Sequence, residues 1–249
     1  MSDITLMLGD CLERMGEIAD GSVDLIAADL PYGTTACKWD VVIPFEPLWA
    51  HYRRVLKPRG AVVLTASQPF TSMLVMSNRE WFRFDDVWDK VGTTGFLDAR
   101  RRPLRRHEAV LVFSPIGKFT YNPLMRKGVF RKKGDSTGSD CYGAHAPVAT
   151  FNDQYFPTSI VEFSNSDQVN KVHPTQKPVA LFEYLLKTYS NPGDLVLDNT
   201  MGSATTLVAA INTDRRAIGI EKDEAIYATA ERRIAAHQAS MPLLAGGAA

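Results

Sequence analysis

Short, almost continuously apolar runs alternate with amphipathic stretches along most of this 249-residue chain. Runs without a polar face are typical of strands in a parallel sheet that is covered on both sides. The runs that predict such strands are Ile4–Leu8, Val23–Ala28, Ala61–Ala66, Ala109–Phe113, Leu195–Leu197 and Ala217–Ile220. The stretches that predict helices are Phe45–Lys57, Pro178–Ser190, Ser203–Asn212 and Asp223–His237. This alternation predicts an α/β fold with a doubly wound sheet.

Residues 114–172 break the pattern, because Gly, Ser, Asn, Asp, Lys and aromatic residues dominate there and periodicity is poor. A loop-rich stretch of that length inside a compact domain usually binds a partner or forms a small subdomain. We therefore predict one α/β domain formed by residues 1–113 and 173–240, an insertion at 114–172 and a frayed tail at 241–249.

Composition narrows the class of protein. With 45% hydrophobic and 22% charged residues, the chain suits one soluble domain with an insertion, or two small ones. No apolar run approaches the ~20 residues that span a bilayer, and no basic segment followed by an apolar core opens the chain, so we expect no membrane partner. Cys11, Cys37 and Cys141 lie far apart, which argues against disulfides or a zinc site and indicates the cytoplasm.

The net charge of zero hides an asymmetry. Between Lys90 and Lys133 there are twelve basic residues and two acidic ones, a net charge of +10 inside a chain whose remainder carries −10. A basic block of this kind indicates either a polyanionic partner or a solvated, charge-rich loop.

Asp29-Leu30-Pro31-Tyr32 follows the apolar run Val23–Ala28 and so lies at the expected end of a buried strand. Asp29 and a backbone carbonyl can accept hydrogen bonds from an exocyclic amino group, and Tyr32 offers a face on which a flat ring can stack. Taken alone, the four residues also fit an ordinary β-turn. The remaining motifs have to decide between these interpretations.

A second motif runs from Leu195 to Thr206, where a strand ends at Asp198 and a small-residue turn leads into a helix. About 20 residues later Glu221 ends the next strand, the position at which an acid binds a ribose in nucleotide-binding βαβ units. The turn holds one glycine, and Asp198 would repel phosphate. A nucleoside that carries an amino group and no phosphate fits better, and S-adenosylmethionine is such a ligand.

This nucleotide unit lies in the last quarter of the chain, whereas it opens the domain in many nucleotide-binding sheets. Ile4–Leu8 can supply the missing third strand from the N-terminus, so the sheet is predicted to be circularly permuted. That order places Asp10 near the adenine end of the cofactor. It also places the strand before Asp29 beside the strand before Asp198.

Taken together, these motifs resemble the β-class amino-methyltransferases of DNA, in particular bacterial and phage adenine-N6 enzymes. The resemblance covers most of residues 3–237. Its motifs are Gly9-Asp10-Cys11, Asp29–Thr35 with Lys38-Trp39-Asp40, Val55–Gly60, Arg106-His107-Glu108, His173–Pro178 and Asp198–Thr206. Two positions depart from the family pattern: Leu30 stands for a proline, and Ala204 stands for a glycine. If position 204 requires a positive φ, alanine costs about 1 kcal/mol there.

The resemblance implies a permuted S-adenosylmethionine-dependent methyltransferase that flips an adenine out of double-stranded DNA and methylates its N6 amino group. The catalytic residues would be Asp29, Leu30, Pro31 and Tyr32. The cofactor residues would be Asp10, Asp198, Thr200, Gly202, Ser203, Ala204, Thr205, Thr206, Glu221 and Lys177, and no metal is implied. Residues 114–172 would recognise the target, with DNA contacts from Arg100, Arg101, Arg102, Arg105, Arg106, Arg126, Lys127, Arg131, Lys132 and Lys133.

Several alternatives stay open from sequence alone. Cytosine-N4 transfer uses the same geometry, although Asp rather than Ser at position 29 favours adenine. A structured RNA substrate and a catalytically silent DNA-binding module are also compatible with these motifs. A P-loop nucleotidase is excluded, because no Gly-x-x-x-x-Gly-Lys-Ser/Thr occurs. The sequence does not reveal the recognition site, or whether a homodimer or a cognate restriction enzyme is involved.

Overall fold

The computed structural model describes residues 3–35, 37, 40–133, 138–139, 141, 143–144, 150–165 and 176–241. The chain forms two compact units, Met1–Asn122 with Ser159–Ala249, and Pro123–Thr158. The second unit is shorter than the insertion expected at 114–172. Residues before it belong to the first unit, where the backbone N–H groups of Thr120 and Asn122 donate to the carbonyls of Arg59 and Thr188.

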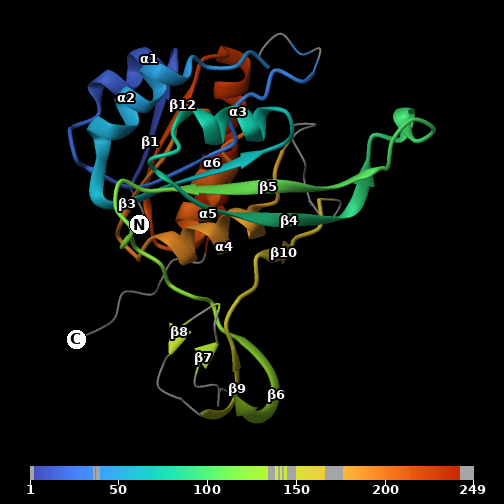
Figure 1. Cartoon of the computed structure of the whole chain (residues 1–249). Helices are drawn as coiled ribbons and strands as arrows, with labels where there is room; N and C mark the ends of the chain where they lie inside the picture. The colour runs from blue at the N-terminus through green and yellow to red at the C-terminus, as the bar shows by residue number, and fades with distance from the viewer. Residues whose placement is uncertain are drawn as a thin grey trace, which may run out of the picture. The chain divides into compact units, whose positions relative to one another are not determined.

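The first unit is built on an eight-stranded sheet of order β1-β12-β11-β2-β3-β5-β4-β10 (Figure 1). Its strands are β1 (Ile4–Leu8), β2 (Val23–Ala28), β3 (Leu56–Ala66), β4 (Phe82–Thr94), β5 (Arg105–Phe113), β10 (Ile160–Glu162), β11 (Leu195–Asp198) and β12 (Arg216–Glu221). The sheet is mixed: the run Ala109–Phe113 was among those expected in a parallel sheet, but β5, which contains it, pairs antiparallel with both β3 and β4. An apolar run indicates a covered strand but carries no information about its direction.

Helices cover both faces of this sheet, as the apolar runs predict. Side chains alternate along β2: Leu25 and Ala27 pack in one core cluster, and Ile26 and Ala28 pack in the other. The first cluster contains α4 (Val179–Tyr189), α5 (Thr205–Asn212) and α6 (Glu224–Ser240). The second contains α1 (Cys11–Arg14), α2 (Phe45–Val55) and α3 (Phe70–Ser77), and the short helix η1 (Met15–Glu17) follows α1.

The strand order brings the two sequence motifs together. β11 lies parallel to β2, with Val196 opposite Leu25 and Leu197 opposite Ile26. β1 lies parallel to β12 along its whole length, so that Leu8 is opposite Glu221. The adjacency predicted for the segments before Asp29 and Asp198 is therefore confirmed. Among the described residues, no helix has the length and apolar character needed to cross a membrane.

The second unit contains two small antiparallel sheets. β6 (Arg126–Lys133) pairs with β9 (Thr150–Tyr155), and β7 (Gly138–Ser139) pairs with β8 (Gly143–Ala144). The Tyr155 ring packs closely against the backbone at Gly128, where a Cβ atom would lie 2.6 Å from the ring. This unit therefore has its own local order, which the poor periodicity of its sequence does not predict.

Candidate active site

A cavity of about 530 Å³ opens at the carboxyl ends of β1, β2, β11 and β12. Ligands of open α/β sheets bind at this edge, and the volume suits a small organic ligand. All the residues predicted for the base clamp and the cofactor line this cavity, with the exception of Ala204. The sites predicted from motifs far apart in sequence are thus halves of one pocket.

The carboxylate of Asp29 is held on both oxygens. Oδ1 accepts hydrogen bonds from the Tyr32 hydroxyl at 2.7 Å and from the Thr65 hydroxyl at 2.5 Å. Oδ2 pairs with the ammonium of Lys177 at 3.0 Å. Three donors, from β3, the segment after β2 and the segment before α4, therefore fix the orientation of one acceptor at the pocket wall.

Lys177 was expected among the cofactor residues, yet its described contacts are on the clamp side. Its ammonium lies between Asp29 and Glu108, 3.1 Å from Glu108 Oε2, and its side chain is only 11% exposed. Glu108 also pairs with the buried Lys90 at 3.2 Å. Burial opposes the charges of Glu108 and Lys177, but Lys177 and Lys90 still hold the pKa of Glu108 below its usual range, and Asp29 and Glu108 raise the pKa of Lys177.

Tyr32 is packed and hydrogen-bonded. Its ring stacks on Phe70 with centroids 5.2 Å apart and planes inclined by 25°, and the Lys177 ammonium lies over the Tyr32 ring at 5.3 Å. Burial, together with the charges of Asp29 and Glu108, raises the pKa of the phenol well above its ordinary value, so the hydroxyl stays a donor. The ring is therefore positioned before any base arrives.

The loop after the clamp is held by Asp40. Its carboxylate accepts hydrogen bonds from the backbone N–H groups of Gly33, Thr34 and Thr35 at 2.8, 2.9 and 2.7 Å. Burial opposes ionisation, but these bonds and the Thr35 hydroxyl lower the pKa of Asp40. Gly33 has φ +66° and a Cβ there would lie 2.8 Å from Val42, so the turn requires glycine.

The cofactor half begins at the end of β11. Asp198 is buried, and burial raises its pKa to about 7, although hydrogen bonds from Thr206 and the Thr200 N–H oppose the shift. The negative charges of Asp29 and Glu221 contribute to the rise. A carboxyl in this state is stabilised as an anion by a cationic ligand, and a phosphate ligand would raise its pKa further.

Acidic groups from neighbouring strands complete this half. The Glu221 carboxylate accepts hydrogen bonds from the backbone N–H groups of Gly202 at 3.1 Å and Asp223 at 2.9 Å. Asp10 follows β1, where the Gly9 N–H donates to the Glu221 carbonyl at 2.9 Å, and its side chain caps α1 through the Leu12 N–H. Carboxylates at adjacent strand ends match the hydroxyl pair of a ribose.

Ala204 lies in the left-handed region, with φ +63° and ψ +35°, directly before α5. Position 204 therefore does require a positive φ. Holding an alanine rather than a glycine in this conformation costs about 1–2 kcal/mol. The side chain is fully buried in the first core cluster, and Ala204 is not among the residues that line the pocket. Of the predicted cofactor residues, Ala204 thus has a backbone role and makes no side-chain contribution to the wall.

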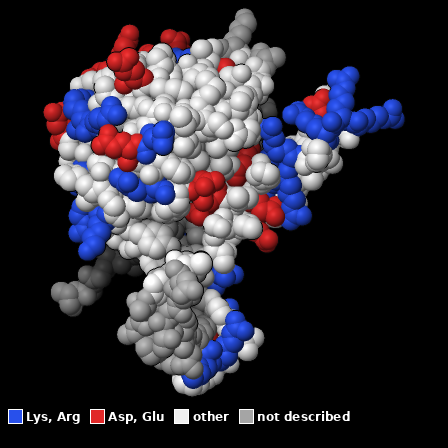
Figure 2. All heavy atoms as spheres, in the orientation of Figure 1, with Lys and Arg blue, Asp and Glu red and all other residues white. Residues whose placement is uncertain are grey.

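The predicted DNA-binding residues of the first unit lie on and beside an arm at residues 91–104, where β4 and β5 extend past the sheet (Figure 1). Figure 2 shows basic side chains gathered on this arm. Arg100 and Arg101 are exposed, and Arg102 pairs with Asp98. Arg105 lines the cavity and donates to the Ser67 hydroxyl at 2.5 Å, whereas Arg106 pairs with Asp89 at 2.7 Å. Arg105 thus belongs to the pocket wall.

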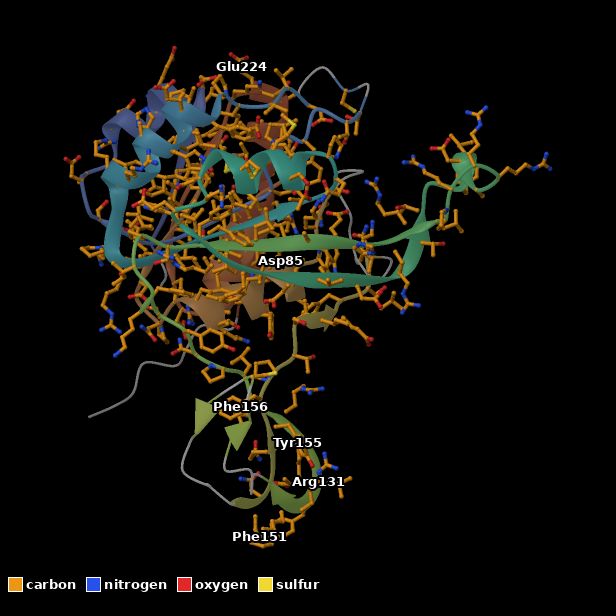
Figure 3. All side chains as sticks on the ribbon, in the orientation of Figure 1. Asp85, Arg131, Phe151, Tyr155, Phe156 and Glu224 are labelled. Carbon is orange, nitrogen blue, oxygen red and sulfur yellow. The ribbon has the colours of Figure 1, made fainter. Side chains whose placement is uncertain are left out.

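The second unit has its own basic hollow of about 300 Å³, lined by Arg126, Lys127, Gly128, Val129, Arg131 and Tyr155. The Arg131 guanidinium lies over the Tyr155 ring at 5.4 Å, and Figure 3 shows these two side chains together. Phe130, Phe151 and Phe156 are 68%, 64% and 70% exposed. Phe119, in contrast, packs on Tyr189 with ring centroids 6.3 Å apart.

Some residues of the quoted motifs and of the predicted DNA contacts lie outside the described ones: Lys38, Trp39 and His173–Thr175, together with the side chain of Lys133. Conversely, Glu108, Lys90, Thr65 and Asp40 were not assigned to the site. Glu108 and Asp40 belong to motifs quoted above, so the sequence could have indicated that they lie at the site. Nothing in the sequence marked Lys90 or Thr65, which reach the clamp only through strand pairing.

Comparisons with known proteins agree with one another in pointing to DNA methyltransferases. A family model described as DNA methylase matches residues 23–232. DNA adenine methyltransferase YhdJ of Escherichia coli K12 is 32% identical over 234 residues, which cover 87% of this chain and 78% of the relative. Type II methyltransferase M.HpaI of Haemophilus parainfluenzae is 28% identical over 246 residues, covering 93% and 74%.

Two solved structures share the fold. The PvuII DNA methyltransferase, titled cytosine-N4-specific, aligns with a TM-score of 0.69 at 17% identity and covers 94% of this chain and 86% of that one. The complex of M1.HpyAVI with SAM aligns with a TM-score of 0.66 at 24% identity and covers 93% and 98%. At these identities the similarity extends to the fold alone.

Proposed function

The chain belongs to the DNA methylase family, and we propose that it transfers a methyl group from S-adenosylmethionine to the N6 amino group of an adenine in double-stranded DNA. The observation that carries this proposal is that one cavity contains both the Asp29 clamp and the cofactor half around Asp198. The carboxylates of the cofactor half would repel a phosphate. The relative named DNA adenine methyltransferase YhdJ supports adenine as the base.

The acidic half fits the cofactor. Glu221 and Asp10 would bind the ribose hydroxyls and adenine end, and Asp198 would face the positively charged methionine portion. Bound S-adenosylmethionine supplies an electrophilic methyl group on a sulfonium. Among the described residues, this half supplies carboxylates, a turn at Gly202 and the cation Lys222, and no cluster of cations that would recognise a diphosphate.

The clamp positions the nucleophile. A flipped adenine would stack against Tyr32 and donate its amino hydrogens to Asp29 and to the Leu30 carbonyl. These bonds would aim the nitrogen lone pair at the methyl group, so that attack is direct and positioning supplies much of the rate. The nitrogen would release its proton after transfer, with Asp29 as the nearest carboxylate. Arg100–Arg102 and the second unit would contact the duplex, chiefly through phosphates.

Cytosine-N4 transfer is the second candidate, because the same clamp geometry serves any exocyclic amino group. Aspartate at position 29 favours adenine over it. Homodimer formation and a cognate restriction enzyme stay predictions that these observations do not address.

The test is incubation of the purified protein with DNA and S-adenosylmethionine carrying a labelled methyl group, followed by hydrolysis to nucleosides and mass spectrometry. We expect label in N6-methyladenine. Label in N4-methylcytosine, or in RNA alone, would contradict the proposal.

A further inference from the structure

The tip of the arm displays two large apolar side chains to solvent. Phe96 is 77% exposed and Leu97 is 87% exposed, and they are adjacent in the short helix η2 (Phe96–Asp98). Among the described residues of the first unit, these are the most exposed large apolar side chains. Neither belongs to a core cluster, and a contiguous exposed apolar patch on a soluble protein is a candidate binding surface.

The tip is held in a defined conformation. Gly95 begins the turn with φ +84°, and the Asp98 carbonyl accepts hydrogen bonds from the backbone N–H groups of Arg101 and Arg102 at 2.8 and 3.0 Å. The Arg102 guanidinium also pairs with the Asp98 carboxylate. The turn therefore presents Phe96 and Leu97 from an ordered support.

The position and charge of the tip match a nucleic acid duplex. Three consecutive arginines, Arg100–Arg102, follow the apolar pair. The root of the arm lines the active-site cavity through Lys90, Thr94 and Arg105. Leu97 is only three residues beyond Thr94, so the apolar pair directly follows the cavity wall along the chain.

We propose that Phe96 and Leu97 form an apolar wedge that enters the base stack of the duplex beside the flipped base, while Arg100–Arg102 hold the adjacent phosphates. This inference rests on the proposed function, since a base that leaves the stack must be flipped into the cavity. Unstacking costs free energy, and apolar side chains inserted between base steps offset it in other kinked or opened duplexes.

The test compares the wild-type protein with the double variant Phe96→Ala/Leu97→Ala on a duplex that carries 2-aminopurine at the target adenine. Release of this base from the stack raises its fluorescence. The matched control is Met73→Ala/Met76→Ala, which removes two apolar side chains that are 48% and 64% exposed on α3. Single-turnover methyl transfer is measured in parallel on a paired duplex and on one with an abasic site opposite the adenine.

We expect the wedge variant to lose most of the fluorescence increase and about tenfold of the transfer rate on the paired duplex, equivalent to about 1.4 kcal/mol. On the abasic duplex, where the target base is already unpaired, its rate should lie within about threefold of the wild type. The control variant should match the wild type on both.

Equal losses on both duplexes, or none on either, would contradict the wedge. So would a wild-type dimer that the wedge variant loses in light scattering, because a second copy would then cover Phe96 and Leu97. The proposed function and the wedge can fail independently in these experiments. A fluorescence increase that depends on the wedge without any methyl transfer refutes the proposed function alone, and full transfer by the wedge variant refutes the wedge alone.

Discussion

The hydroxyl of Thr200 donates a hydrogen bond of 3.1 Å to the backbone carbonyl of Asp29, although 171 residues separate them. The bond joins the cofactor turn after β11 to the clamp after β2, and it depends on the pairing of these two strands. It therefore couples the position of the methyl donor to that of the acceptor. Small displacements between reacting groups reduce rates strongly, so this contact bears directly on catalysis.

Replacement of Thr200 by valine keeps the shape and removes this bond. We expect methyl transfer to fall by about five- to tenfold, which corresponds to about 1 kcal/mol for one hydrogen bond. The matched control is Thr229→Val, whose hydroxyl bonds only within α6. Single-turnover rates at saturating cofactor make the measurement, and equal rates for both variants would show that the bond has no catalytic role.

Asp198 predicts a pH dependence of cofactor binding. Its pKa of about 7 in the free protein means that the carboxyl is largely protonated below pH 7, whereas a cationic cofactor favours the ionised form. Affinity should therefore rise with pH up to about 7, by up to about tenfold per unit, and then level off. Calorimetry in buffers of different ionisation enthalpy should detect proton release near pH 6.

Asp198→Asn is the control for this dependence, and a variant that still releases the proton would exclude Asp198 as its source. The pH dependence of folding stability has the opposite sign to that of cofactor affinity. Because the folded pKa is raised above the unfolded value of about 3.9, this group lowers the stability of the free protein progressively between about pH 4 and 7.

Glu108 is predicted to be a positioning residue for the clamp. In Glu108→Gln, the buried ammonium groups of Lys177 and Lys90 lose a counter-charge, so the free energy of unfolding should fall by about 3 kcal/mol. The pKa of Lys177 should also fall, because Glu108 helps to raise it. Denaturant unfolding measures the first effect, with the exposed Glu46→Gln as control. Equal stability of the two variants would contradict the buried network.

Asp40 is predicted to hold the loop after the clamp. Asp40→Asn leaves backbone N–H groups of residues 33–35 without a charged acceptor and should lower the free energy of unfolding by about 1–3 kcal/mol. Since the pKa of Asp40 is lowered, the native contribution is complete above about pH 4 and is lost as pH falls through the folded pKa. The control is Asp20→Asn at an exposed ion pair, which should change stability little.

Sequence patterns predicted those strands and helices whose burial is visible as an apolar run or an amphipathic repeat. β1 and β2 have the predicted bounds because their runs are almost continuously apolar, with Thr5 and Asp24 as the exceptions. β4 was missed because acids interrupt it and its outer half forms the exposed arm. The circular permutation stays a prediction, although the strand pairs on which it depends are present.

The residues of the candidate site likewise fall into those that the sequence predicted and those that it did not. Asp29, Asp198 and Glu221 were identified because each follows a recognisable strand, and parallel strand ends meet at one edge. The Lys177–Glu108 pair was not predicted, because it joins the start of α4 to an antiparallel strand across 69 residues of sequence. Pairings of this kind depend on strand direction, which apolar runs do not encode.

In the proposed mechanism, Asp29 and its neighbours bind a flipped adenine beside the methyl donor. The most direct measurement is sequencing, with detection of modified bases, of DNA from methylation-deficient cells that express the wild type or Asp29→Ala. We predict N6-methyladenine at one defined site for the wild type and none for the variant, with cofactor binding by the purified variant nearly intact. N4-methylcytosine in the wild-type DNA, or full methylation by Asp29→Ala, would contradict the account.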